Sequence, residues 1–113
     1  GLVSIAPGQT ALIHTGLALA IPQGYVGLVY ARSGLATKQG LAPANKVGVI
    51  DADYRGELMV SLYNHSNETR TVACGDRIAQ LVIAPYLTAQ FQEADELDDT
   101  QRGAGGFGST GVR

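Results

Sequence analysis

The chain has 113 residues, of which 45% are hydrophobic and 16% charged, and its formal net charge is −2. This length fits one small domain able to bury a core, and the scattered lysines and arginines provide no basic field for nucleic acid. A single cysteine excludes an internal disulfide framework and a multi-cysteine zinc site. No apolar run approaches the ~20 residues that span a bilayer. We therefore expect a soluble, cytoplasmic protein without nucleic-acid or membrane partners, some of whose surface is covered by sister subunits.

The apolar segments are short and are interrupted every few residues by Gly, Pro, Asn or Asp, which predicts an all-β sandwich or barrel. The expected strands are residues 10–14, 17–21, 24–30, 47–50, 56–64, 70–72, 77–85 and 90–93. A helical turn is predicted over residues 33–39, with Ser33 as N-cap and Gly40 ending it in left-handed geometry. After residue 93 the composition becomes acidic and then glycine-rich. We expect residues 1–93 to form a β-rich core and residues 94–113 a linker and mobile arm.

The first polar constellation is Arg32-Ser33-Gly34, at the end of a predicted strand. A guanidinium, a hydroxyl and the backbone N–H groups of a helix start together suit a phosphate. Taken alone, this tripeptide fits equally well a helix cap beside a surface arginine. Its functional interpretation depends on the motifs that follow.

The second constellation is the run from Gly48 to Glu57, an apolar strand that breaks into a turn rich in carboxylates. Asp51 follows an apolar strand residue directly, so its carboxylate is expected at the strand mouth as a general base toward water, in preference to Asp53. Tyr54 either fills the core or packs against a sugar, leaving no room for a 2′-hydroxyl. Turn-forming aspartates are the alternative explanation of this segment.

The third constellation, Gly75 to Leu81, carries Gln80 as the polar member of an apolar strand. A buried amide requires partners, so Gln80 is either a structural glutamine or one that positions a ligand or water. The fourth is the C-terminal arm, whose glycines allow backbone N–H groups to wrap phosphates. Its candidate residues supply charge, a stacking ring, a glycine backbone and hydroxyls: Arg102, Phe107, Gly108, Ser109 and Thr110. His14 and His65 are expected to be structural or solvated.

In order, these four segments resemble motifs two to five of the homotrimeric dUTPase family. The most specific are Gly-Val-Ile-Asp-x-x-Tyr-Arg-Gly-Glu, at residues 48–57, and Arg-Gly-x-Gly-Gly-Phe-Gly-Ser-Thr-Gly, at residues 102–111. The resemblance implies a distorted jelly-roll, or β-clip, subunit with a short helix. It also implies Mg²⁺-assisted hydrolysis of dUTP to dUMP and pyrophosphate, which limits uracil in DNA and supplies dUMP for dTMP synthesis. The three active sites would lie at subunit interfaces.

The resemblance also implies roles for individual residues. Asp51 would activate the water that attacks the α-phosphorus, and Gln80 would help to hold that water and the phosphates. Phosphates would be bound from a neighbouring subunit by Arg32, Ser33 and Gly34. Uracil would be recognised by the hairpin that contains Asn45, Val49, Ile50 and Met59, with Tyr54 beneath the deoxyribose. The lid would be completed by Arg102, Phe107, Gly108, Ser109 and Thr110. Mg²⁺ would have no direct protein ligand and would be held through substrate phosphates and waters.

The sequence differs from the family pattern at two places, and two alternative functions are weighed against the dUTPase activity. The chain begins after the position of the family's first motif, whose aspartate helps to hold the waters around Mg²⁺, and Ala31 stands where a proline is usual. A catalytically impaired deoxynucleotide-binding trimer is therefore the alternative function. A dCTP deaminase is disfavoured, because that activity requires a glutamate where this chain has Ser61.

Overall fold

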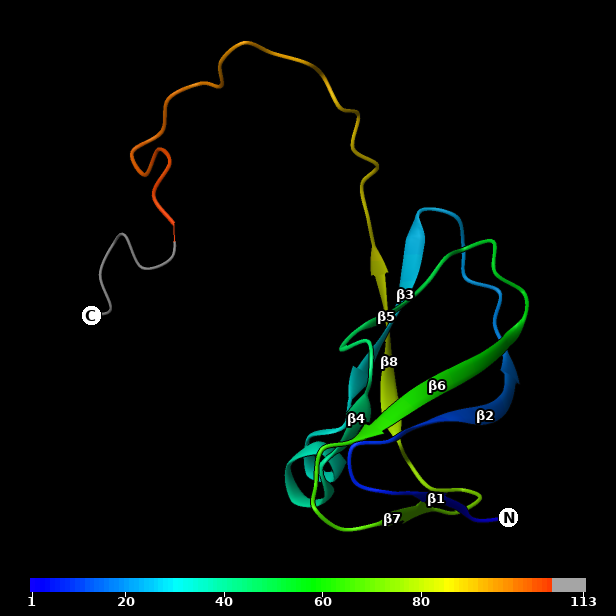
Figure 1. The fold of residues 1–113 in the computed structure, drawn as a ribbon. Coiled ribbons are helices and arrows are strands. Elements are labelled where there is room, and N and C mark those ends of the chain that lie inside the picture. The colour runs from blue at the N-terminus through cyan, green and yellow to red at the C-terminus, as the bar shows by residue number, and fades with distance from the viewer. Residues whose placement is uncertain (107–113) are drawn as a thin grey trace.

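The computed structural model of the chain describes residues 1–106 and, within them, three antiparallel sheets joined by short turns (Figure 1). One sheet pairs β1 with β7, the second has the order β2-β6-β4, and the third has the order β5-β3-β8. The elements are β1 Val3–Ile5, β2 Thr10–Ala18, β3 Tyr25–Ala31, the short helix η1 Leu35–Gln39, β4 Leu41–Pro43, β5 Gly48–Ile50, β6 Glu57–Asn64, β7 Arg70–Val72 and β8 Ala79–Pro85. The prediction of an all-β fold with a short helix is confirmed.

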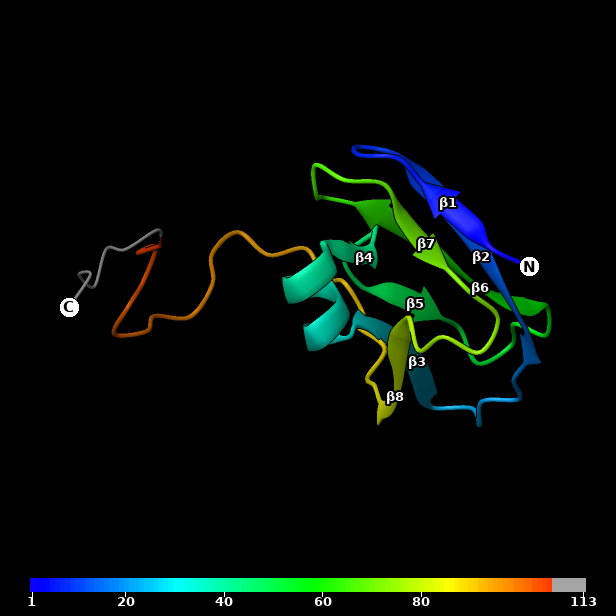
Figure 2. The same cartoon turned by 90° about the horizontal axis from the view of Figure 1, so that it is seen from below.

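A single apolar cluster joins the three sheets. Its members come from six of the strands and are Ile5, Ile13, Val29, Leu41, Val60, Leu62 and Val72. The alternation along β6 explains the arrangement, because Val60 and Leu62 point inward while Met59 points outward. In Figure 2, β1 and β2 lie on one side of the body and β3 and β8 on the other. The cluster therefore fixes how the sheets that carry the polar motifs are placed.

A buried asparagine closes the end of β6. The Asn64 side chain is fully buried, and its amide nitrogen donates to the carbonyls of Ile5 and Glu68, each at 2.8 Å. Its amide oxygen accepts from the backbone N–H and the hydroxyl of Ser66 at 2.9 and 2.7 Å. Both the nitrogen and the oxygen of this buried amide are therefore fully hydrogen-bonded.

Several predicted boundaries were wrong. Residues 10–14 and 17–21 do not form two strands, because β2 continues through an irregularity in its pairing with β6 between His14 and Ala18, where Gly16 has a φ of 73°. The short strands β1 and β4 were not predicted. Residues 90–93 form no strand in this chain, since the arm leaves the body after β8 and no other strand lies beside it (Figure 1).

The short helix also begins differently from the prediction. η1 is a π-helix whose N-cap is Gly34, and no side chain caps it, so Ser33 does not play that role. Gly40 does end the helix in left-handed geometry, with a φ of 70°, as predicted. Within residues 1–106, the structure holds no helix with the length and hydropathy of a transmembrane span.

Candidate active site

The turn between β5 and β6 presents the candidate base. Asp51 follows β5 directly and is exposed, and its carbonyl accepts a 3.1 Å hydrogen bond from the N–H of Tyr54 that closes the turn. The guanidinium of Arg55 braces the same turn by donating to the carbonyl of Ala52 at 2.6 Å. A cleft of about 420 Å³ runs beside the turn and is lined by Ile21, Gln23, Asp51, Ala52, Asp53, Arg55 and Tyr86. Both carboxylates of the turn border this cleft, which is open to water.

Tyr54 lies flat against the backbone of Gly56. Its hydroxyl donates to the carbonyl of Glu57 at 2.7 Å, and the ring passes so close that a Cβ on Gly56 would lie 2.5 Å from the tyrosine Oη. Glycine is therefore required at position 56 by space. Tyr54 is 43% exposed, so the structure excludes core filling and leaves one side of the ring free to contact a ligand.

The remaining candidates for base recognition lie in the predicted hairpin, residues 45–59, whose strands β5 and β6 belong to different sheets in the structure and do not pair with each other. The apolar residues Val49 and Met59 are exposed, with exposed fractions of 65% and 40%, whereas Ile50 is half-buried. Asn45 is exposed in the turn before β5, and its amide nitrogen lies beside the backbone of Gly48. The structure thus gathers five of the predicted substrate residues near one hairpin: Asn45, Val49, Ile50, Tyr54 and Met59.

The candidate phosphate-binding residues lie at the far end of β3. Gln80 is paired with Tyr30 across β3 and β8, and its amide nitrogen donates to the carbonyl of Ala31 at 2.8 Å. Arg32 follows Ala31, and both Arg32 and Gln80 line a groove of about 890 Å³. The expectation that Gln80 is buried was wrong, since it is exposed, as are Ser33 and Gly34. An exposed amide oxygen and an accessible guanidinium remain available to a ligand.

These two groups of residues are separated within one chain. Ile50, which precedes Asp51, pairs with Gly27 near the start of β3, whereas Arg32 lies beyond the end of that strand. Five residues separate Gly27 from Arg32, and at about 3.3 Å per strand residue this amounts to roughly 16 Å. Asp51 and Arg32 of one chain therefore lie too far apart to act on neighbouring phosphates of the same ligand.

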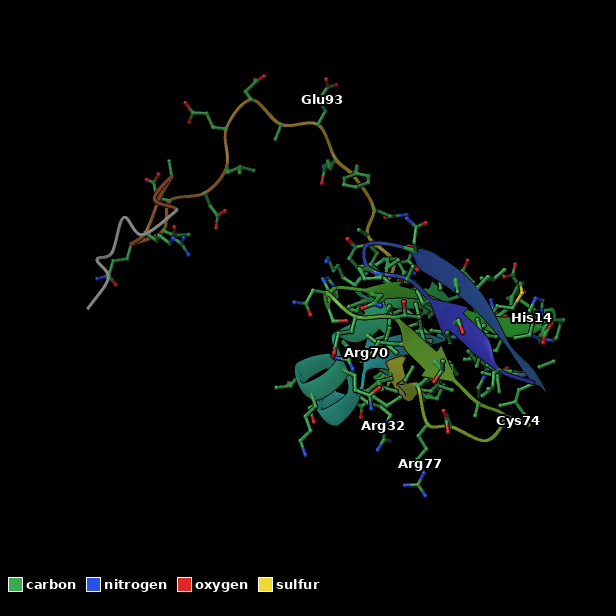
Figure 3. All side chains as sticks on the ribbon, turned by 60° about the horizontal axis from the view of Figure 1, so that its bottom comes forward. His14, Arg32, Arg70, Cys74, Arg77 and Glu93 are labelled. Atoms are coloured by element: carbon green, nitrogen blue, oxygen red, sulfur yellow. The ribbon has the colours of Figure 1, made fainter. Side chains whose placement is uncertain are left out.

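Over residues 94–106, the part that the structure describes, the C-terminal arm contacts neither group. Arg102 folds back locally, where its Nε donates to the carbonyl of Gly105, and the N–H of Gly103 donates to the Thr100 hydroxyl at 3.0 Å. Figure 3 shows Glu93 on the arm, well away from Arg32 and Arg77, whose side chains project from the body. The other predicted arm residues, Phe107, Gly108, Ser109 and Thr110, lie outside the described residues.

One charged pair beside the hairpin was not singled out from the sequence. His14 lies on β2, and its Nδ1 donates a 2.9 Å hydrogen bond to the carboxylate of Glu57, the first residue of β6. This hydrogen bond, followed by the one from the N–H of Gly16, lowers the pKa of the Glu57 carboxyl below its usual value. The two residues are 43 positions apart, so only the pairing of β2 with β6 brings them together.

The side chains of residues 1–106 are compatible with a metal ion that binds together with a phosphorylated ligand. Among residues 1–106, no group of three or more histidines, cysteines, aspartates or glutamates is placed to hold a metal ion. Mg²⁺ commonly keeps several waters and binds through one or two carboxylates together with substrate phosphates. The exposed carboxylate of Asp51 and the open cleft beside it meet that requirement.

The all-β fold, the carboxylate at a hairpin mouth and the arginine beside a strand-borne glutamine fit a class of jelly-roll proteins that bind phosphorylated ligands. The dUTPase family model matches residues 2–111. The chain is 57% identical over 111 residues to a deoxyuridine 5′-triphosphate nucleotidohydrolase of Desulfitobacterium hafniense, covering 97% of this chain and 74% of that protein. It is 52% identical over 111 residues to the protein of the same name from Maricaulis maris, with coverages of 98% and 73%.

Solved structures agree with the sequence relatives. The fold superposes on a Staphylococcus bacteriophage 80alpha dUTPase with dUpNHpp at a TM-score of 0.90 and 32% identity, covering 99% of this chain and 82% of that one. It also resembles a mutant dUTPase of phage phi11 of S. aureus in which a structural Mg(II) ion is coordinated, at a TM-score of 0.76, 31% identity and coverages of 84% and 78%. This chain belongs to the dUTPase family.

Proposed function

We propose that this protein hydrolyses dUTP to dUMP and pyrophosphate, with Asp51 as the general base. Asp51 would take a proton from a water as the water oxygen bonds to the α-phosphorus, and the bond from that phosphorus to the bridging oxygen would break. The observation that carries the proposal is the exposed Asp51, which borders an open cleft and lies in the turn closed by the N–H of Tyr54. Membership of the dUTPase family supports it. We place the activity in the cytoplasm, where the free Cys74 is compatible with a reducing environment.

The nucleoside would bind at the hairpin. Backbone groups around Asn45, Val49 and Ile50 would pair with uracil, and cytosine would meet the wrong pattern of donors and acceptors there. The free side of the Tyr54 ring would contact the deoxyribose and exclude a 2′-hydroxyl. The exposed Met59 would contribute apolar surface at the same hairpin.

The phosphates would be bound by the other group of residues. The guanidinium of Arg32 forms strong charge-assisted hydrogen bonds with phosphate oxygens, and Ser33 and Gly34 would add a hydroxyl and backbone N–H groups. Gln80 would orient a phosphate or the attacking water. The arm residues Arg102, Phe107, Gly108, Ser109 and Thr110 would close over the bound nucleotide and exclude water.

Mg²⁺ fits this site as a partner of the triphosphate. It would be held through the substrate phosphates and through waters near Asp51, and when bound it would neutralise phosphate charge. Removing the metal with a chelator should therefore abolish pyrophosphate release while the protein stays folded.

The complete site would be shared between copies of the chain in a homotrimer. Arg32 and Asp51 are too far apart to meet on one ligand in a single chain, so the hairpin of one copy would face the phosphate-binding residues of another. The surface supports such contacts, because β8 exposes Leu81, Val82 and Ile83 by 39%, 43% and 47%. The arm would then reach across to a neighbouring copy rather than fold onto its own body.

The test is pyrophosphate release from dUTP, dCTP, dTTP and UTP with Mg²⁺, after the oligomeric state has been measured. We expect release from dUTP alone, and we expect its loss in Asp51→Asn but not in Asp53→Asn. Nucleotide binding without release by a folded trimer would instead favour the catalytically impaired deoxynucleotide-binding protein. Equal release from dUTP and dCTP would contradict the assignment of uracil recognition to the hairpin.

A further inference from the structure

We propose that His14 and Glu57 are positioning residues that hold Tyr54 where it can reject a 2′-hydroxyl. The inference rests on the proposed function, because it assigns to this pair a role in the sugar selectivity of the same site. Neither residue would touch the substrate. They would act through the first residues of β6, on which Tyr54 depends.

Glu57 joins β2 to the start of β6 through both of its carboxylate oxygens. One oxygen is 2.9 Å from the Nδ1 of His14, and the other accepts a 2.9 Å hydrogen bond from the N–H of Gly16. Gly16 sits in the irregular part of β2, where regular pairing with β6 is interrupted between His14 and Ala18. The carboxylate thus replaces strand hydrogen bonds that the irregularity removes.

The next residue of β6 is tied to the same segment. The hydroxyl of Thr15 donates to the carbonyl of Leu58 at 2.5 Å and accepts from the N–H of Leu17 at 3.1 Å. The backbone at residues 57 and 58 is therefore fixed from the β2 side by His14, Gly16 and Thr15. His14 and Thr15 line the same groove as Arg32 and Gln80, although Figure 3 shows the side chains of His14 and Arg32 at different places on the body.

Tyr54 receives its position from that fixed backbone. Its hydroxyl donates to the Glu57 carbonyl at 2.7 Å, and its ring lies against Gly56, where there is no space to move closer. A shift of the Glu57 main chain would carry the acceptor with it. The tyrosine ring would then tilt relative to the cleft beside Asp51.

Among the described residues, Glu57 forms an ion pair with His14 alone. His14 and Glu57 are the only charged or imidazole side chains on β2 and β6. On the adjoining turn, Arg55 donates to the carbonyls of Ala52 and Tyr54, and no ion pair joins Arg55 or any other described cation except His14 to Glu57.

The experiment measures kcat/KM for dUTP and for UTP on the full chain and on His14→Ala and Glu57→Gln. The ratio of the two kcat/KM values cancels any effect on catalysis that both substrates share. Glu68→Gln is the matched control, since Glu68 also forms a surface ion pair, at 3.4 Å from Arg70, but its carboxylate forms no hydrogen bond or ion pair with residues 51–57. Thermal unfolding checks that each variant is folded.

We expect both variants to lower the dUTP-to-UTP ratio by roughly two- to fivefold, as for exposed ion pairs. Glu68→Gln should keep the wild-type ratio. In a Tyr54→Ala background, Glu57→Gln should change the ratio no further, whereas a merely structural role would not depend on Tyr54. If Glu57→Gln does not fold, the exposed His14→Ala decides alone.

The two failures can be told apart. A folded wild type that releases no pyrophosphate from dUTP overturns the proposed function and this role with it. An active wild type whose His14→Ala variant keeps the full dUTP-to-UTP ratio overturns the positioning role alone.

Discussion

Replacing Gly56 with alanine should damage catalysis more than it damages the fold. The new Cβ would lie 2.5, 2.7 and 3.0 Å from the Oη, Cζ and Cε1 of Tyr54, distances that no real Cβ keeps, so the ring must move. Because Tyr54 is 43% exposed, the ring can swing into solvent and spare the core. The displaced ring loses its 2.7 Å hydrogen bond to Glu57 and its place beside the cleft.

The size of the effect follows from these two losses. One hydrogen bond contributes about 0.5–1.5 kcal/mol, and an off-rotamer side chain costs about the same, so the sum is about 1–3 kcal/mol. If this is lost from transition-state binding, kcat/KM for dUTP should fall by about 5- to 160-fold. The assay is steady-state pyrophosphate release, with the midpoint of thermal unfolding measured alongside.

The control is the same substitution in a Tyr54→Ala background. Without the ring there is nothing for the new methyl group to displace, so Gly56→Ala should then cost little further activity. Wild-type kcat/KM in the Gly56→Ala single variant would refute the reasoning. So would an equal loss with and without the tyrosine, since the damage would then come from the backbone.

Three further predictions concern stability, pH and the choice of base. Asn64→Ala removes four buried hydrogen bonds and should lower the free energy of unfolding by roughly 2–4 kcal/mol, measured by denaturant titration. Because His14 lowers the pKa of Glu57 below its ordinary 4.5, the carboxylate stabilises the fold above that pH, and this stability should be lost as the pH falls through the folded-state pKa. Wild type and Glu57→Gln should therefore converge in thermal midpoint under acid conditions. Asp51→Asn should abolish turnover while Asp53→Asn retains most of it, and loss in both would mean that the two carboxylates of the cleft act together.

The sequence predicted the strands that have a clear inner and outer face. In β6 the alternation of Val60 and Leu62 with exposed neighbours is visible in the sequence, and this strand was placed to within a residue at its start and correctly at its end. β2 was divided in two, because Gly16 is typical of a turn when its hydrogen bond to the Glu57 carboxylate and the register of β2 with β6 are unknown. The three-residue strands β1 and β4 are too short to show a period at all.

The sequence predicted which residues belong to the candidate site better than it predicted how they are arranged. Asp51 and Gln80 could be singled out because a polar residue at the end or in the middle of an apolar strand needs a reason. The separation of Asp51 from Arg32 could not be predicted from the sequence, because it depends on the register of β3 with β5 and β8. The pair of His14 with Glu57 was missed for the same reason, and no local signal marks either residue.

Complementation between two inactive variants tests most directly the claim that this chain is a dUTP hydrolase whose site is shared between copies. Asp51→Asn and Arg32→Ala would each be inactive alone, and mixed oligomers would be formed by co-expression. If each site takes its base from one copy and its arginine from another, a random equal mixture should recover about a quarter of wild-type pyrophosphate release from dUTP. No recovery from mixed oligomers of proven composition would contradict the account, because it would mean that Asp51 and Arg32 act within a single chain or not on the same ligand.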